Sequence, residues 1–311
     1  MCPGLTPETE KGHGKPATTR SGLQNRLNIA YQYSQKWHFD FNPTKCRVLA
    51  FSKHRDLTIN VKLGQNRISQ TSSEEHLGVC IATTKEEELK YMQKRIRGCK
   101  SIVHTMKSIG SHKVPLSPNI ASKIYCSVVI PKLVYGMEAM NSNEDVIDEL
   151  ESFHRDNAKM LQGLPKQSAN PSGLVTMGWN SIQSITEVVR LQFLWRVLML
   201  PMNNIYKIAM LRRLYQVVTQ CNSVTIHSPT SVIVNICSKY GLLDTVFEAI
   251  ESGQYMSKSV WNKHIKAIIY SRDHKCQMIT CKLYRSMHRV NFGSRLEMSS
   301  WWKFCTKYPG Y

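Results

Sequence analysis

The aspartates of this chain are the first residues to consider for catalysis, because two-metal phosphoryl transfer depends on clustered carboxylates. The two metal ions of such a site lie about 3.5–4 Å apart, so their ligands must converge. The seven aspartates are Asp40, Asp56, Asp145, Asp148, Asp156, Asp244 and Asp273. No two are adjacent, and Asp145, Asp148 and Glu149 begin a predicted helix, where the helix dipole favours acids. We prefer that explanation, so the sequence predicts no metal site.

A second group with possible chemistry lies near the end of the chain, where His274, Cys276, Cys281 and His288 occur together. Structural zinc sites pair their ligands as Cys-x(2–4)-Cys and His-x(3–5)-His, and this order and spacing fit poorly. Two cysteines on one predicted helix are more often packed in a core. The sequence also contains no Gly-x-Ser-x-Gly, Gly-rich phosphate loop or His-Glu-x-x-His motif.

The strongest signal for binding is a basic stretch between Leu89 and Met137 that contains no acid. Its nine cations are Lys90, Lys94, Arg95, Arg97, Lys100, Lys107, Lys113, Lys123 and Lys132. Lys90, Lys94 and Arg97 recur at helical spacing, away from the apolar positions of the same helix. A solvated surface normally mixes both signs of charge, so nine cations without an acid favour a surface that faces phosphates.

The whole chain is basic as well, with 41 Lys and Arg against 22 acids among 311 residues, a formal charge of +19. Such a charge attracts polyanions, either nucleic acid or an anionic membrane. The most apolar stretch, Ile124 to Met140, is interrupted by Pro131, Lys132 and Glu138, so we expect no membrane span. We therefore expect RNA or DNA as the partner.

Ten cysteines raise the question of disulfides. No Cys-x-x-Cys pair occurs, and the first twenty residues contain no apolar segment typical of a secretory signal. We expect reduced thiols and a location in the nucleus or cytoplasm, and we do not expect secretion.

Hydrophobic periodicity predicts two kinds of structure after a disordered leader at residues 1–20. A helix begins at Ser21, with Leu23, Leu27 and Tyr31 on one side. Alternating residues then predict strands, and they are found at 37–41 (Trp37, Phe39 and Phe41 facing one side), 46–51, 57–63, 67–69 and 76–81. Residues 21–84 are therefore predicted to be a helix followed by a small, mostly antiparallel sheet.

After residue 84 the pattern becomes helical and stays so. One apolar stripe contains Leu89, Met92, Ile96, Cys99, Val103 and Met106. Further helices are predicted at 118–130, 144–162, 181–200, 203–219, 229–240, 243–251 and 257–290. The predicted fold class is α+β, with a helical region at 85–165 and a C-terminal helical region at 166–311.

The order of these elements resembles the part of LINE-type (non-LTR retrotransposon) reverse transcriptases that follows the catalytic Tyr-x-Asp-Asp box. Residues 22–53, GLQNRLNIAYQYSQKWHFDFNPTKCRVLAFSK, look like the family's helix, tryptophan-bearing strand and Asn-x-x-Lys turn. Asn42, Lys45 and Phe51 stand at the matching positions. The resemblance implies that Lys45 is a remnant of the catalytic apparatus, where a lysine near the incoming nucleotide assists the leaving pyrophosphate.

Two later segments extend the resemblance through residue 165, and more weakly through residue 215. EEHLGVCI (residues 74–81) is similar to the family's primer grip, with His76, Leu77 and Gly78 at the matching positions. The basic helix and residues 117–140 are similar to the thumb, which packs on the template–primer duplex. The resemblance thus implies that residues 21–84 are a palm remnant and 85–165 a thumb.

The chain departs from the family in containing no Asp-Asp pair. We therefore expect a truncated reverse transcriptase that binds nucleic-acid backbone but does not polymerise by itself. Mg²⁺ is expected only for the intact family enzyme. The alternative is a non-catalytic helical module that binds an acidic protein.

Overall fold

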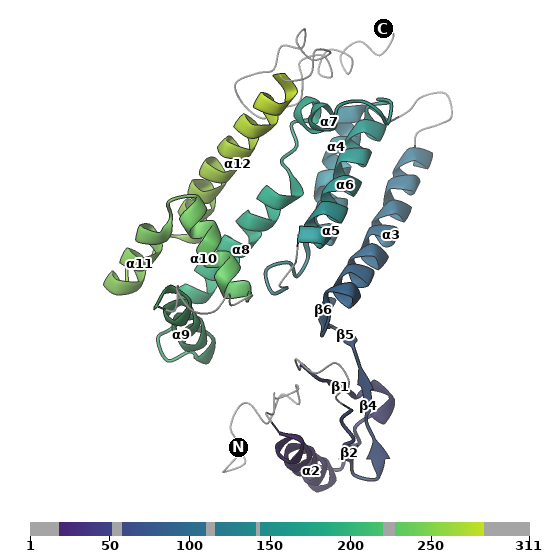
Figure 1. The fold of residues 1–311 in the computed structure, drawn as a ribbon, viewed down its shortest axis with the longest axis vertical. Helices are drawn as coiled ribbons and strands as arrows, with labels where there is room; N and C mark the ends of the chain where they lie inside the picture. The colour runs from purple at the N-terminus through teal and green to yellow at the C-terminus, as the bar shows by residue number, and fades with distance from the viewer. Residues whose placement is uncertain (1–18, 52–57, 110–115, 141–143, 220–227, 283–311) are drawn as a thin grey trace. The chain divides into compact units, whose positions relative to one another are not determined.

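A computed structural model describes residues 19–51, 58–109, 116–140, 144–219 and 228–282 (Figure 1). The chain divides into two compact units, Met1–Glu88 and Leu89–Tyr311, here called the N-terminal and C-terminal units. The described part is mainly helical and carries three two-stranded sheets, which agrees with the α+β class. The four-part division expected from the sequence stays a prediction.

The N-terminal unit begins with helix α2 (Arg20–Lys36), as the periodicity predicted. Thr19 caps it by accepting a hydrogen bond from the Gly22 amide, which satisfies one of the unpaired donors of the first turn. The apolar side of α2, formed by Leu23, Leu27 and Tyr31, packs on a small core. The buried members of that core are Val48, Val61, Leu63 and Ile68.

The strands of this unit are β1 (Arg47–Leu49), β2 (Lys62–Leu63), β3 (Asn66–Arg67), β4 (Ser69–Thr71), β5 (Ser73–His76) and β6 (Val79–Ala82). They form three separate pairs, not one sheet. β2–β3 and β5–β6 are antiparallel hairpins, but β1 and β4 are parallel. The prediction of mostly antiparallel pairing is therefore confirmed, and the prediction of one sheet was wrong. A long connection separates β1 from β4, and such a connection allows the chain to return in the same direction.

The strand predicted at residues 37–41 was also wrong, because these residues form no strand. His38 has a positive φ of 53°, which breaks the extended conformation immediately after α2. Trp37 and Phe39 are exposed and do not line the core. These alternating aromatic residues instead pack in pairs at the end of the helix, Trp37 with Tyr33 and Phe39 with Phe41.

Helix α3 (Lys85–Ile109) is the predicted basic helix, with Glu86, Glu87 and Glu88 in its first turn. The predicted apolar stripe is confirmed in the C-terminal unit, where Met92, Ile96, Cys99, Val103 and Met106 are all buried.

The next helical segment is continuous but irregular, and runs through α4 (Pro118–Ile124), a π turn η2 (Tyr125–Val129) and α5 (Ile130–Val134). Ser117 caps α4 by accepting a hydrogen bond from the Ile120 amide. The π turn has a local reason. The ring of Pro131 would clash with the carbonyl of Ser127 in a regular helix, and the wider turn, closed by the Ile130 amide on the Tyr125 carbonyl, accommodates it.

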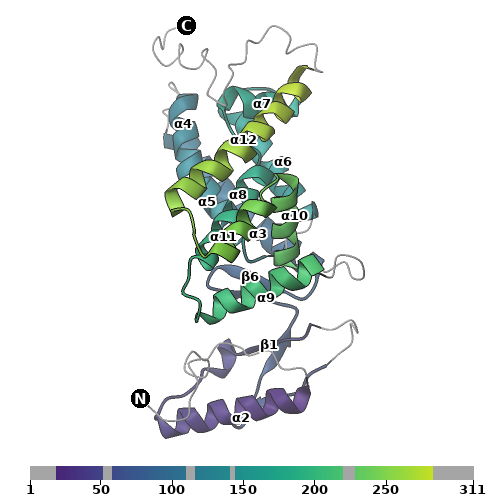
Figure 2. The same ribbon diagram turned by 90° about the vertical axis from the view of Figure 1, so that its left-hand side faces the viewer.

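Seven further helices complete the described part of the C-terminal unit. The first six are α6 (Glu144–Leu161), α7 (Asn170–Met177), α8 (Ile182–Leu198), α9 (Ile205–Thr219), α10 (Pro229–Lys239) and α11 (Leu243–Ser252). They are followed by α12 (Lys258–Lys282), which packs along α8 and α7 (Figure 2). All were predicted except the short α7. Residues 283–290 of the last predicted helix lie outside the described part.

The core of these helices contains two stacked indoles, Trp195 of α8 and Trp261 of α12, with ring centroids 4.0 Å apart. Both are completely buried, and each indole N–H donates to a backbone carbonyl, Met256 and Leu191 respectively. In the part of the chain that the structure describes, we find no helix with the length and apolar character of a membrane span.

Candidate nucleic-acid interface

The outer face of α3 carries the cations that the sequence singled out. Successive residues of a helix are rotated by about 100°, so Lys90, Lys94 and Arg97 lie within about 60° of one another. They are exposed and lie roughly opposite the buried stripe. The stripe holds this helix against its unit, and packing therefore directs the three cations toward solvent.

Lys100 is exposed on the flank of the same face, and His104 continues the face toward the end of the helix. Lys107 lies on α3, but its side chain is outside the described part. A further cation, Lys132 of α5, lies close to Gly98 of α3. A Cβ built on Gly98 would be 3.4 Å from Lys132 Nζ. The lack of a side chain at Gly98 thus lets the Lys132 ammonium lie against α3, next to the basic face.

Arg95 points elsewhere, although the sequence grouped it with the other cations. It is half-buried, and its guanidinium donates to the backbone carbonyls of Leu133 and Tyr135. It also lies 5.1 Å from the ring centroid of Tyr91, one turn earlier. Arg95 therefore joins α3 to the end of α5, and its hydrogen-bonding groups are occupied by the protein.

The positive charges on this side of α3 also act on a buried thiol. Burial raises the pKa of Cys99, while Lys132 and Arg95 act in the opposite direction. Cys99 is completely buried in the stripe.

His76, Leu77 and Gly78 lie in the N-terminal unit, at the tip of the β5–β6 hairpin. His76 pairs with Val79, so Leu77 and Gly78 form a two-residue turn with φ of 51° and 76°. Positive φ at both central residues defines a type I′ turn, which normally takes Asn-Gly. A leucine there is strained by about 1–2 kcal/mol, and its side chain is 77% exposed. Strain of this kind occurs at binding sites more often than elsewhere.

Lys45 ends a short 3₁₀ turn, η1 (Pro43–Lys45), just before β1. Asn42 caps the turn, because its side-chain oxygen accepts from both the amide and the hydroxyl of Thr44. The Asn-Pro-x-Lys pattern thus has a structural explanation in this turn, and the Lys45 side chain is exposed.

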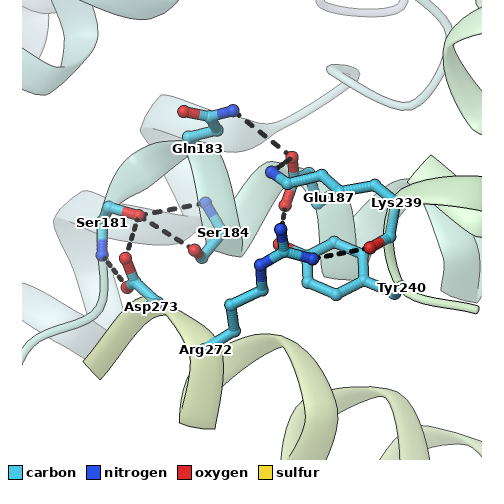
Figure 3. A network of polar contacts seen from close by, with 8 residues as sticks. All are labelled: Ser181, Gln183, Ser184, Glu187, Lys239, Tyr240, Arg272 and Asp273. Carbon is cyan, nitrogen blue, oxygen red and sulfur yellow. Dashed lines mark hydrogen bonds and ion pairs between the residues drawn. The ribbon is translucent and has the colours of Figure 1, made fainter. Parts of the chain in front are cut away.

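A polar network between α8, α10 and α12 was not predicted (Figure 3). Glu187 of α8 accepts from Lys239 Nζ at 2.7 Å and from the Tyr240 hydroxyl at 2.6 Å. On α12, Asp273 accepts from the amide and hydroxyl of Ser181, and Arg272 donates to the Lys239 carbonyl. Burial, followed by the hydrogen bond to Glu187, raises the pKa of Tyr240 well above its ordinary value.

This network joins three helices, and each of its charged groups has a hydrogen-bond partner in the protein, so we assign it a structural role. Sequence reasoning missed it because its members come from three distant helices and share no spacing.

Metal ligation finds no support in the described residues. They contain no group of three or more His, Cys, Asp or Glu side chains that could hold an ion, and this covers His274, Cys276 and Cys281. His288 lies outside the described part. These residues therefore offer no fitting ligand set for the Mg²⁺ that is expected only for the intact family enzyme.

The structure thus brings Lys90, Lys94, Arg97, Lys100 and Lys132 together on one side of α3, and places Lys45 and the His76–Gly78 turn in the other unit. Comparisons of the chain with protein-family models, with curated proteins and with solved structures found no match.

Proposed function

We propose that this chain binds the sugar–phosphate backbone of RNA or DNA through the basic face of α3. The observation that carries the proposal is the position of Lys90, Lys94 and Arg97, exposed on the side of the helix opposite its buried stripe. Phosphate contacts need flexible cations at a surface and no particular sequence of bases. The stretch from Leu89 to Met137 supplies such cations and no acid that would repel phosphates.

We further propose that the chain corresponds to the palm remnant, thumb and following helices of a LINE-type reverse transcriptase. The proposal is supported by the order of elements: α2, the Asn42-capped turn, the β5–β6 hairpin and then the basic helix. In this scheme α3 contacts the template–primer duplex, and the strained Leu77–Gly78 turn corresponds to the family's primer grip. Lys45 corresponds to the family's lysine that assists the leaving pyrophosphate.

The proposal includes no polymerase activity of this chain alone. Two-metal catalysis needs converging carboxylates, and the seven aspartates of the sequence are dispersed. A primer-extension assay with Mg²⁺ and the four deoxynucleotides should yield no product above background. Extension that depends on added template would contradict this part of the proposal.

The binding proposal is tested by a salt titration of a fluorescent duplex in a polarisation assay. If about five phosphates of the duplex are contacted, the logarithm of the association constant should fall with log salt with a slope of about −4.5. Changing Lys94, Arg97 and Lys100 to Glu should lower affinity by at least tenfold and reduce the slope by about 2 to 3.

The matched control reverses three exposed lysines of α12, namely Lys263, Lys266 and Lys275, and changes the net charge by the same amount. This control should bind nearly as well as the unchanged chain. Equal losses in the two triple variants would mean that net charge alone attracts the duplex, and a slope near zero would contradict backbone binding altogether.

A second function, binding of an acidic protein, is favoured by one observation on α9. Ile205 and Tyr206 are large and exposed, and Arg212 and Arg213, two turns later on the same side of α9, are exposed with them. Tyrosine and arginine are among the residues most enriched where proteins bind tightly. Under this function, changing Tyr206 and Arg213 to Ala abolishes capture of the partner, while the α3 triple variant leaves capture unchanged.

A further inference from the structure

Four aromatic side chains at the end of α2 form a second candidate surface, in the N-terminal unit. Their rings are in sequential contact, with centroid distances of 6.1 Å for Tyr33–Trp37, 6.0 Å for Tyr33–Phe39 and 5.2 Å for Phe39–Phe41. We call these four residues the aromatic platform. Trp37 is 49% exposed and Phe39 is 40% exposed, although aromatic rings of this size are usually buried.

Backbone hydrogen bonds at the helix end hold the platform in place. The Phe39 amide donates to the Ser34 carbonyl, and the His38 amide donates to the Gln35 carbonyl. These two bonds, with His38 at a φ of 53°, make a Schellman motif. Glycine usually occupies the position of His38, so the motif carries a strained residue. The motif fixes Trp37 and Phe39 on either side of one turn, and little entropy is lost when they bind a ligand.

The charge around the platform suits a polyanion. Lys36 Nζ lies 5.9 Å from the Trp37 ring centroid, and Lys45 is exposed after Phe41 in the chain. The described residues between 19 and 84 contain seven Lys or Arg and three acids. An exposed apolar surface with this charge fits a ligand that offers flat rings along a negative backbone.

A pocket shares one residue with the platform. It has a volume of about 380 Å³ and is lined by Tyr31, Ser34, Asp40, Phe41, Pro43, Leu63, Gln65 and Asn66. Its volume lies within the usual range for small-molecule sites, about 300–1,000 Å³. Tyr31 and Phe41 offer aromatic surface, while the Asp40 carboxylate and the Gln65 and Asn66 amides can hydrogen-bond the polar edge of a heterocycle.

We propose that the aromatic platform stacks on the unpaired bases of a single nucleic-acid strand, and that the pocket receives one such base. Every base has a flat π-face, so stacking of this kind tolerates any sequence. The bases of a duplex are already stacked on each other, and they are therefore not available to Trp37. This site belongs to the N-terminal unit, whereas the basic face of α3 belongs to the C-terminal unit. It gives the chain a preference for single strands over duplex, which phosphate contacts alone do not provide.

The experiment compares three ligands of equal length on the full chain: single-stranded DNA, single-stranded RNA and duplex. Changing Trp37 to Ala should weaken single-strand binding by about fivefold or more, as expected for the loss of one stacked base. Duplex binding and the salt slope should stay unchanged. Trp37→Phe keeps an aromatic face, so it should retain most of the affinity but lose the quenching of indole fluorescence on binding.

Phe51→Ala is the matched control, because Phe51 is an exposed aromatic residue of the same unit whose ring contacts none of the described aromatic rings. It should leave single-strand binding unchanged. Asp40→Asn tests the pocket and should change the preference among homopolymers of the four bases. Circular dichroism and thermal melting confirm that each variant is folded.

Three outcomes would overturn the proposal. Trp37→Ala could bind single strands as well as the unchanged chain does, or it could lose single-strand and duplex binding equally. It could also abolish a self-association of the chain detected by light scattering without nucleic acid, which would identify the platform as an interface between copies. The α3 triple variant distinguishes the two sites, because its loss extends to duplex binding and the salt slope, and that of Trp37→Ala does not.

Discussion

The Tyr125 hydroxyl lies 3.1 Å from His154 Nδ1, and both side chains are buried in the C-terminal unit. His154 Nε2 lies 3.0 Å from the Asn180 carbonyl, which can only accept, so Nε2 carries the imidazole proton. Nδ1 therefore accepts from Tyr125. The rings of Tyr125, His154 and Trp179 are stacked, and Trp179 donates to the Ser122 hydroxyl. The two partners thus fix the tautomer of the neutral histidine, and burial keeps the ring neutral.

The first prediction concerns acid stability. Burial, with a smaller contribution from Arg155, lowers the pKa of His154 from 6.5 to about 4, although the hydrogen bond to Asn180 acts against it. Because the folded pKa is below the unfolded one, the contribution of His154 is fully present above pH 6.5. It is lost as pH falls toward 4, to a total of about 3 kcal/mol.

The measurement is the free energy of urea unfolding of the chain and of its His154→Gln variant between pH 4 and 7.5, followed by hydrogen exchange in α6. Burial raises the pKa of Glu151, so this group changes the free energy of unfolding with pH in the opposite direction. That contribution is common to both proteins and cancels in the difference between them. The difference between the two proteins should shrink below pH 6.5, and a difference that is independent of pH would contradict the assignment.

A second prediction distinguishes the two neighbouring arginines of α3. Arg95→Ala should lower the free energy of unfolding by about 1–3 kcal/mol, because the Leu133 and Tyr135 carbonyls lose a charged donor. Arg97→Ala should leave stability within about 0.5 kcal/mol and weaken duplex binding, since Arg97 is exposed. Urea titration measures the stability of both variants, and polarisation measures their duplex binding. A stable Arg95→Ala with weak binding, or an unstable Arg97→Ala that binds normally, would contradict this assignment.

The third prediction compares two ion pairs. Glu187 is buried and accepts from both Lys239 and Tyr240, so Glu187→Ala should cost about 1–3 kcal/mol. The loss of stability is smaller than for a fully buried ion pair, because the Lys239 side chain is 38% exposed and can be solvated once Glu187 is removed. Glu138 lies 3.9 Å from the half-exposed Arg196, so Glu138→Ala should cost less than about 1 kcal/mol. Equal costs in thermal unfolding would contradict the structural role of the network.

The fourth prediction uses two glycines with positive φ. A Cβ on Gly64 would lie 2.5 Å from the Tyr31 ring, while one on Gly163 would meet nothing within 4 Å. Gly163→Ala should therefore cost only the backbone strain, about 1 kcal/mol. Gly64→Ala adds a clash and should cost about 1–3 kcal/mol more, because the ring must move. Hydrogen exchange measured separately in α2 and α6 reports each unit, and equal losses would mean that Tyr31 moves freely.

Local periodicity predicted the helices well, because an amphipathic helix carries its own signal. The stripe from Met92 to Met106 is buried, and the helix predicted from residue 118 begins there. Helix α7 was missed, since its eight residues are nearly all apolar or small and show no stripe. The strands failed where pairing is non-local: nothing between Arg47 and Leu49 specifies that their partner is the parallel strand β4.

For the candidate interface, the sequence could predict only which side of α3 carries the cations. Spacing placed Lys90, Lys94 and Arg97 on the outer side of α3, but the same spacing could not show that Arg95 reaches the carbonyls at the end of α5. The approach of Lys132 to Gly98 depends on the packing of α5, which no pattern within α3 contains. The exposed platform was missed for a related reason, because alternating aromatics were interpreted as a strand facing a core.

The π turn at Tyr125–Val129 amounts to one extra residue inserted in a helical register. Every residue after it is rotated by about 100° from the position that a regular helix would give. Lys132 and Leu133 owe their directions, toward Gly98 and into the core respectively, to that single insertion. Removing one residue here would turn Lys132 away from α3, and it would also bring the Pro131 ring against the carbonyl that the wider turn avoids.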